Sequence, residues 1–331
     1  MKGSHMLNVY EWRTDRLVRL DDTAAHNTSC WIDLVSPTPA EVAALETLTG
    51  IEIPSRDDMD DVEPSARFYA EDGAVFMIAS VVTDLETPDP VKMPVTFILK
   101  GGRLVTVRYG QPRSFRLFVT RAMNKPNEKL ANGEAIFMGL IEAVVDRYAD
   151  ALEAKGIELD TISRLIFRKR DPKAMESHNL QLVIRDIGRA GDFLALIRES
   201  LSNLQRLLAY HAAVSGAKAG GKGDREARQM VRLVQRDAAA LGELSVSMSA
   251  KVTFLMDATL GLINLEQNQI IKIFSVASVA LLPPTLIASI YGMNFEIMPE
   301  LKWQYGYPLA VGAMVLSAAL PYLYFRKKRW L

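Results

Sequence analysis

The chain has 331 residues, of which 39 are Lys or Arg and 39 are Asp or Glu, so its formal net charge at neutral pH is zero. This balance argues against nucleic-acid binding through bulk charge, and the single cysteine, Cys30, excludes an intrachain disulfide. The sequence has no P-loop, no dinucleotide-binding glycine motif and no ligand motif around its histidines. We therefore expect neither an enzyme nor an organic cofactor.

The first part of the chain predicts a mixed α and β domain. Residues 1–6 resemble a remnant of an expression vector and are set aside, and residues 7–125 follow without a secretory signal, which indicates a cytoplasmic location. Thr38, with Glu41 three positions later, predicts a capped helix start. Gly101 and Gly102 predict a hairpin turn. Strands are expected at residues 31–35, 75–82, 95–99 and 104–108.

Residues 126–224 predict a helical cytoplasmic region. From residue 132 onward apolar residues recur at helical spacing. A further helix is expected over residues 173–211, and a glycine-rich loop over residues 215–223. No proline occurs between Asp224 and Pro283. Residues 225–269 therefore predict a stalk helix that continues into the membrane and links the cytoplasmic domain to it.

Two apolar runs near the C-terminus predict a transmembrane hairpin. Residues 270–291 and 307–325 are each close to the roughly 20 apolar residues that cross a bilayer, and the short segment 292–306 separates them. The tail, residues 326–331, contains the basic cluster Arg326, Lys327, Lys328 and Arg329. Basic residues beside a span stay in the cytoplasm, so both termini are expected there. The cluster could also bind anionic lipid or acidic helices.

One face of the first span is unusually polar. At alternating steps of three and four, small or hydroxylated residues recur, interrupted by two large apolar ones. The stripe consists of Asn268, Ile271, Ser275, Ser278, Leu282, Thr285, Ser289 and Gly292. It could pack against a partner helix, or several copies could surround an aqueous path. Pro283 and Pro284 predict a bend in the middle of the span, either a static kink or a gating hinge.

The end of the first span carries the most specific motif. The string Tyr291-Gly292-Met293-Asn294-Phe295, followed by residues 296–301 and then Lys302-Trp303, closely resembles the signature of the CorA family of magnesium transport proteins. Residues 266–272 and 282–285 resemble the pore helix of the same family. The resemblance implies an α+β cytoplasmic domain with long stalk helices and a C-terminal hairpin. These would assemble into a funnel-shaped homopentameric channel in the bacterial inner membrane.

The same resemblance implies roles for individual residues. Gly292, Met293 and Asn294 would form the selectivity filter, and the first span would line the pore. Phe274 and Tyr291 join the stripe as further pore candidates. Glu296 and Glu300 would form acidic rings that attract cations, although a solvated loop also explains them. Leu282 and Ile271 would form apolar rings that can gate by dewetting.

Family members sense intracellular Mg²⁺ through acidic residues between neighbouring subunits. Asp84, Glu86 and Asp237 are the candidates chosen here, because an acid at a strand end facing an acid on the stalk would suit such a site. Clustered carboxylates on a solvated surface are the competing interpretation. Mg²⁺ is then both the transported and the regulatory ion, and no organic cofactor is expected.

Two other functions remain open. The chain could be a zinc transporter of the same superfamily, including a proton-coupled one, although the first span contains no carboxylate or His. Alternatively, it could be a membrane-anchored scaffold or sensor that only oligomerises. The expected partners are other copies of the chain, membrane lipids and divalent cations, with Co²⁺ and Ni²⁺ as further candidate ions.

Overall fold

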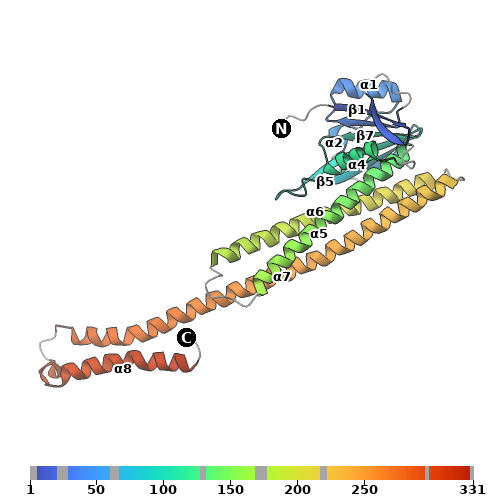
Figure 1. Cartoon of the computed structure of the whole chain (residues 1–331). Coiled ribbons are helices and arrows are strands. Elements are labelled where there is room, and N and C mark those ends of the chain that lie inside the picture. Colours follow the sequence, from blue (N-terminus) through green and yellow to red (C-terminus); the bar gives the residue numbers. More distant parts are fainter. Residues whose placement is uncertain are drawn as a thin grey trace. The chain divides into compact units, whose positions relative to one another are not determined.

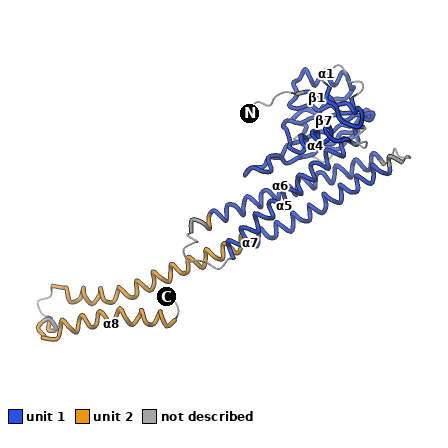
Figure 2. The backbone as a smooth tube through the Cα atoms, viewed as in Figure 1, with its two compact units in different colours: residues 1–169, 182–255 blue, residues 170–181, 256–331 orange. Residues whose placement is uncertain are grey.

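The computed structural model describes residues 6–20, 29–59, 67–126, 132–167, 177–216, 222–294 and 298–328. They form two compact units, residues 1–169 with 182–255 and residues 170–181 with 256–331 (Figure 2). In chain order the elements are β1 (Met6–Arg13), β2 (Arg16–Leu20), β3 (Trp31–Val35), α1 (Pro39–Thr49), α2 (Arg56–Met59), β4 (Phe68–Glu71), β5 (Ala74–Thr83), β6 (Val91–Lys100), β7 (Arg103–Arg108), α4 (Arg113–Asn124), α5 (Gly133–Phe167), α6 (Ser177–Gly216), α7 (Lys222–Tyr291), the 3₁₀ helix η3 (Pro299–Lys302) and α8 (Gly306–Lys327) (Figure 1).

The described strands of the first unit form one mixed sheet in the order β2-β1-β3-β7-β6-β5-β4. Only β3 and β7 are parallel, with Trp31 opposite Leu104, and the other neighbours are antiparallel. The predicted hairpin between β6 and β7 is confirmed. Gly101 and Gly102 both have positive φ, at 58° and 80°, as the tight turn between antiparallel strands requires.

Helices cover both faces of this sheet (Figure 1). Alternate strand residues point to opposite faces, so Ile32 and Leu34 join a core with Leu45 of α1 and Met59 of α2. On the other face Trp31 packs edge-on against Phe118 of α4, with ring centroids 6.0 Å apart. The α+β prediction is confirmed. Helix α1 begins at the capping box that Thr38 and Glu41 predicted.

A buried ion pair ties the two parallel strands together. Asp33 of β3 accepts two hydrogen bonds from the guanidinium of Arg108, at 2.9 and 2.8 Å. It also accepts one from Thr106 Oγ1 at 2.8 Å. The side chains of Asp33 and Arg108 are only 1% and 7% exposed. Full pairing makes this burial tolerable, because an unpaired charge there would be strongly destabilising.

Side chains from α5 and α6 complete the part of β5 that β4 leaves uncovered. β4 pairs only with Ala74–Met77 of this strand. Further along, Asn203 Oδ1 accepts from the Ser80 amide at 3.0 Å, and Tyr148 Oη accepts from the Val82 amide at 2.7 Å. Burial raises the pKa of Tyr148 to about 12, because the low-polarity surroundings disfavour the charged phenolate.

Strand β1 and the helices α6 and α7 begin or end at other residues than the sequence predicted. Residues 1–6 were set aside, yet β1 begins at Met6, which pairs with Val35. The predicted loop over residues 215–223 is too long, because α6 continues to Gly216 and α7 begins at Lys222. Glycine next to alanine was taken as a loop signal, but glycine is also common where a helix ends. The predicted continuity of the long helix is confirmed, since α7 is one unbroken helix through both prolines.

Candidate ion-transport site

The C-terminal unit contains two helices that are long and apolar enough to cross a membrane. One is α7, which this unit shares with the first unit, and the other is α8. Most of their apolar side chains are exposed in a single chain, including Leu282 at 66% and Leu316 at 61%. A soluble helix would bury such residues, so both helices require lipid or further copies of the chain around them.

The polar stripe lies on the uncovered side of α7. Its members from Asn268 to Ser289 are all exposed. The covered side consists of Val276, which is buried, and of Ala280, Pro283, Pro284, Ile287 and Tyr291, which are partly buried. With 3.6 residues per turn, Val276, Ala280 and Ile287 point almost directly away from the centre of the stripe. The structure therefore leaves the stripe free to face other copies or water.

Two candidate pore residues sit differently from the rest of the stripe. Phe274 is beside it and is exposed. Tyr291 is partly buried on the covered side of α7, so in a single chain it does not share the direction of Ser289. Neither residue is a member of the stripe itself, and Phe274 was a candidate because it is adjacent to the proposed apolar rings.

Two hydroxyl groups of the stripe bond to their own helix. Ser275 Oγ donates to the Ile271 carbonyl at 2.8 Å, and Thr285 Oγ1 donates to the Leu281 carbonyl at 2.7 Å. This arrangement satisfies the hydroxyl hydrogen without a partner helix. The oxygen lone pairs are then available to accept hydrogen bonds from water around a hydrated cation.

The Gly-Met-Asn motif forms the end of α7. The Gly292 amide donates to the Ala288 carbonyl at 2.9 Å, and a Cβ at Gly292 would lie 3.1 Å from that carbonyl oxygen. A larger residue would therefore crowd this turn. Met293 and Asn294 follow with exposed side chains. The motif thus places an amide at the tip of the exposed helix end.

The neighbouring candidate residues are only partly within the described chain. Glu296 lies outside the described residues, and Glu300 is in η3 with its side chain outside them. At the other end of α8, Arg326 and Lys327 lie in the last helical turn, where cations favour the helix dipole. The Lys328 ammonium lies 5.4 Å from the ring centroid of Tyr324. Arg329 lies outside the described residues.

The structure gives the regulatory candidates separate surroundings. Glu86 forms ion pairs with Arg113 and Arg147. Desolvation alone would raise its pKa, but the two arginines outweigh it and lower that pKa. Asp84 follows β5 with a positive φ of 56°. Asp237 Oδ1 lies 3.8 Å from Nε of the adjacent Arg236. Within the described part of a single chain, no three His, Cys, Asp or Glu side chains form a metal-binding group.

Asp237 instead interacts with an acid that the sequence reading missed. Partial burial raises the pKa of Asp146 on α5, and the negative charges of Asp150 and Asp237 raise it further. Asp146 and Asp150 are four residues apart, so they lie on one helical face. That spacing is a signal in the sequence, but only the packing of α5 and α7 brings Asp237 to it.

Comparisons with known proteins agree with this architecture. The family model described as CorA-like Mg²⁺ transporter protein matches residues 26–327. The chain is similar to proteins named magnesium transport protein CorA. The relative from Yersinia pseudotuberculosis is 35% identical over 330 residues, covering 98% of this chain and 100% of the relative. The relative from Escherichia coli K12 is also 35% identical, with the same coverage.

Two solved structures share the fold. The CorA magnesium transporter from Methanocaldococcus jannaschii matches with a TM-score of 0.71 at 19% identity, covering 98% of this chain and 99% of that chain. The cytoplasmic domain of ZntB from Vibrio parahaemolyticus matches with a TM-score of 0.54 at 13% identity, covering 78% and 98%. Because the family model and the relatives span nearly all of the sequence, this chain belongs to the CorA-like Mg²⁺ transporter family, whose members are transporters and not enzymes.

Proposed function

We propose that this protein is a homopentameric channel that carries Mg²⁺ into the cell across the bacterial inner membrane. Family membership and the names of the 35% identical relatives support Mg²⁺ as the transported ion. One hairpin cannot enclose a pore, so the proposal requires several copies. Five copies of the C-terminal part of α7 would surround the path, and five copies of α8 would form an outer ring.

The observation that carries this proposal is the exposed stripe on α7. A helix whose small and hydroxylated residues face away from its covered side has a polar face that lipid does not favour. A water-filled lumen at the centre of an oligomer would satisfy it. Many of the other exposed residues of the two apolar runs, such as Leu316 on α8, are apolar and suit contact with lipid.

At the mouth, a ring of Asn294 side chains would select a hydrated ion. Mg²⁺ gives up its water reluctantly and prefers octahedral oxygen ligands. Amide oxygens can accept hydrogen bonds from that water shell without stripping it. Met293 would pack around the loop, because thioether sulfur is a poor ligand for a hard cation. Glu296 and Glu300 would raise the local concentration of cations.

Inside the path, Leu282 and Ile271 would form the constrictions, with Phe274 beside them. Narrow apolar rings gate by dewetting. Replacing either residue with Ala should widen the ring and produce a leak of cations in a flux assay. If both variants conduct as the unmodified protein does, the gate lies elsewhere.

Regulation would act through carboxylates between neighbouring cytoplasmic domains. Asp84 and Asp237 remain the candidates, together with Glu86, which would first have to leave Arg113 and Arg147. Bound Mg²⁺ would neutralise repelling acids and favour a closed pentamer. Replacing all three with Ala should leave channels open at high internal Mg²⁺, and unchanged inhibition would contradict this assignment.

The deciding experiment is Mg²⁺ flux into proteoliposomes that contain a Mg²⁺-sensitive dye, comparing the unmodified chain with Asn294→Ala. Flux that the substitution abolishes while pentamers persist would support the channel and its Asn ring. Zn²⁺ uptake that responds to a proton gradient, without Mg²⁺ flux, would favour a zinc transporter. No flux of either ion from folded protein would favour a scaffold.

A further inference from the structure

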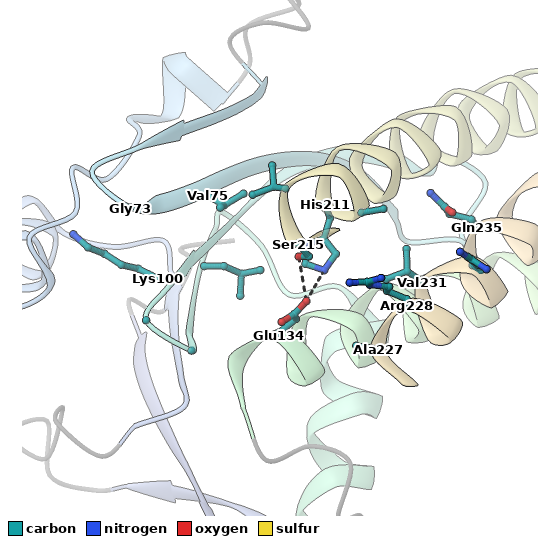
Figure 3. Close-up of a pocket in the computed structure, with 16 residues that line it drawn as sticks. Gly73, Val75, Lys100, Glu134, His211, Ser215, Ala227, Arg228, Val231 and Gln235 are labelled. Atoms are coloured by element: carbon teal, nitrogen blue, oxygen red, sulfur yellow. Dashed lines mark hydrogen bonds and ion pairs between the residues drawn. The ribbon is translucent and has the colours of Figure 1, made fainter. Parts of the chain in front are cut away.

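A cavity of about 560 Å³ lies within the first unit. It forms where the hairpin between β6 and β7, the first turn of α5, the last turns of α6 and the beginning of α7 come together (Figure 3). Its polar lining includes Glu134 of α5, His211 and Ser215 of α6, and Arg228 and Arg232 of α7. A polar cavity of this size holds several waters.

His211 is the unusual group in this lining. Its side chain is 2% exposed, and its ring packs against Phe137 with centroids 4.9 Å apart. Its Nε2 atom lies 3.2 Å from Glu134 Oε1, but the contact does not have the geometry of a hydrogen bond. A buried polar atom that forms no hydrogen bond is destabilising, so a ligand in the cavity that bonds to Nε2 would stabilise the site.

Ser215 and His211 both lie beside the Oε1 atom of Glu134, so three side chains meet there (Figure 3). Its Oγ donates to Glu134 Oε1 at 3.2 Å. Zinc-type ions bind imidazole nitrogen and carboxylate oxygen at about 2.0–2.2 Å. His211 Nε2 and Glu134 Oε1 lie 3.2 Å apart. Both atoms can therefore bind one ion, with an angle at the ion close to the tetrahedral value.

The position of Glu134 is set by the backbone. The preceding Gly133 amide donates to the Gly102 carbonyl at 2.7 Å. A Cβ on Gly133 would lie only 2.3 Å from the Leu104 amide nitrogen, so α5 begins directly against the hairpin. This contact fixes the backbone next to Glu134 before any ion arrives, which lowers the entropy lost on binding.

We propose that His211, Glu134 and Ser215 form a site for a borderline divalent ion of the Zn²⁺, Co²⁺ or Ni²⁺ class, with cavity water completing the coordination. Imidazole favours these ions, whereas Mg²⁺ prefers oxygen ligands alone. Arg228 and Arg232 are solvent-exposed, so solvent screens their repulsion of the ion. The site joins the start of α5 to the end of α6, and it does not depend on the proposed pore.

The test is a Co²⁺ titration of the full-length protein in detergent, followed by visible absorption in the presence of excess Mg²⁺. We expect a site for one ion per chain, and its affinity should fall at least about tenfold in His211→Ala and in Glu134→Gln. Ser215→Ala should have a smaller effect. His178→Ala is the matched control, because it also removes one imidazole, and it should bind as the unmodified chain does.

A second readout separates metal binding from a structural role. Co²⁺ should raise the melting temperature of the unmodified chain and of His178→Ala, but not that of the two ligand variants, because an ion stabilises only the state that binds it. If His211→Ala does not fold, Glu134→Gln decides the question. Absence of Co²⁺ binding to the unmodified chain, or equal affinity in Glu134→Gln, would overturn the proposal.

Discussion

The two units of this chain treat apolar side chains in opposite ways. In the first unit, Leu34 lies in the core with no exposed surface, whereas Leu282 and Leu316 of the second unit are 66% and 61% exposed in a single chain. Water drives the burial of the first group. The second group needs lipid or neighbouring copies instead. The exposure of leucine therefore indicates whether a part of the chain folds in water or needs lipid or another copy around it.

Polar groups show the same contrast. In the first unit, Asp33 and Arg108 are buried and satisfy each other across two strands. In the second unit, Ser275 and Thr285 satisfy their hydroxyls on their own helix. Tertiary hydrogen bonds stabilise the folded sheet, whereas the helix of the hairpin completes its bonding alone, as a membrane-spanning segment must. Substitutions of buried groups in the first unit should accordingly lower the stability of the fold more than substitutions of exposed groups in the second unit.

The largest loss of stability should come from Asp33→Ala. It leaves the Arg108 guanidinium buried without its carboxylate, and breaking such a pair typically costs about 3–5 kcal/mol. Denaturant unfolding of the full chain in detergent, followed through tryptophan fluorescence, measures the change. Glu71→Ala removes an exposed carboxylate from the same sheet and should change the free energy of unfolding by less than about 0.5 kcal/mol. Equal changes in the free energy of unfolding for the two variants would show that the buried pair stabilises the fold no more than an exposed carboxylate does.

A matched pair of leucine substitutions tests the contrast between the units directly. Leu34→Ala should destabilise the first unit by about 2–5 kcal/mol, because it leaves a cavity in the core. Leu316→Ala should leave the unfolding of that unit unchanged, since lipid tails are as apolar as leucine. Both variants are measured by the same unfolding assay. A comparable loss from Leu316→Ala would mean that α8 supports the fold of the first unit.

Tyr148→Phe should have an intermediate effect. It removes the phenol oxygen that accepts from the Val82 amide, and a buried amide without a partner costs about 1–3 kcal/mol. Tyr322→Phe on α8 is the control, because that ring is largely exposed. Thermal unfolding followed by near-ultraviolet circular dichroism should separate the two variants. Identical melting curves for both would argue that water replaces the phenol at β5.

The smallest expected effect is the pH dependence of Glu86. Because Arg147 and Arg113 lower its pKa below the ordinary 4.5 despite desolvation, the ionised carboxylate stabilises the fold above pH 4.5, and this contribution disappears as pH falls through the lowered value. The group is half exposed, so the contribution is below about 1 kcal/mol. Glu86→Gln should differ from the unmodified chain at pH 7 and converge with it once the pH is well below the lowered pKa. A difference that persists at low pH would rule out the ion pairs as its cause.

Local signals in the sequence were sufficient for several features. The capping box at Thr38 and Glu41, the turn at Gly101 and Gly102 and the unbroken helix up to Pro283 each depend on residues within a few positions of one another. The two apolar runs and the Gly-Met-Asn motif are also contiguous. Backbone geometry and the length needed to cross a bilayer act locally, so these features could be predicted without the fold.

Features that join distant parts of the chain came only from the tertiary structure. The sequence proposed Asp84, Glu86 and Asp237 for a site between subunits. Within one chain, packing pairs Glu86 with Arg113 and Arg147 and brings Asp237 near Asp146, and no local pattern predicted these contacts. The sheet order and the meeting of His211 with Glu134 are of the same kind. Periodicity shows which face of an element is apolar but not which element covers it. That choice depends on the packing of the whole unit, because many side chains must fill one core together.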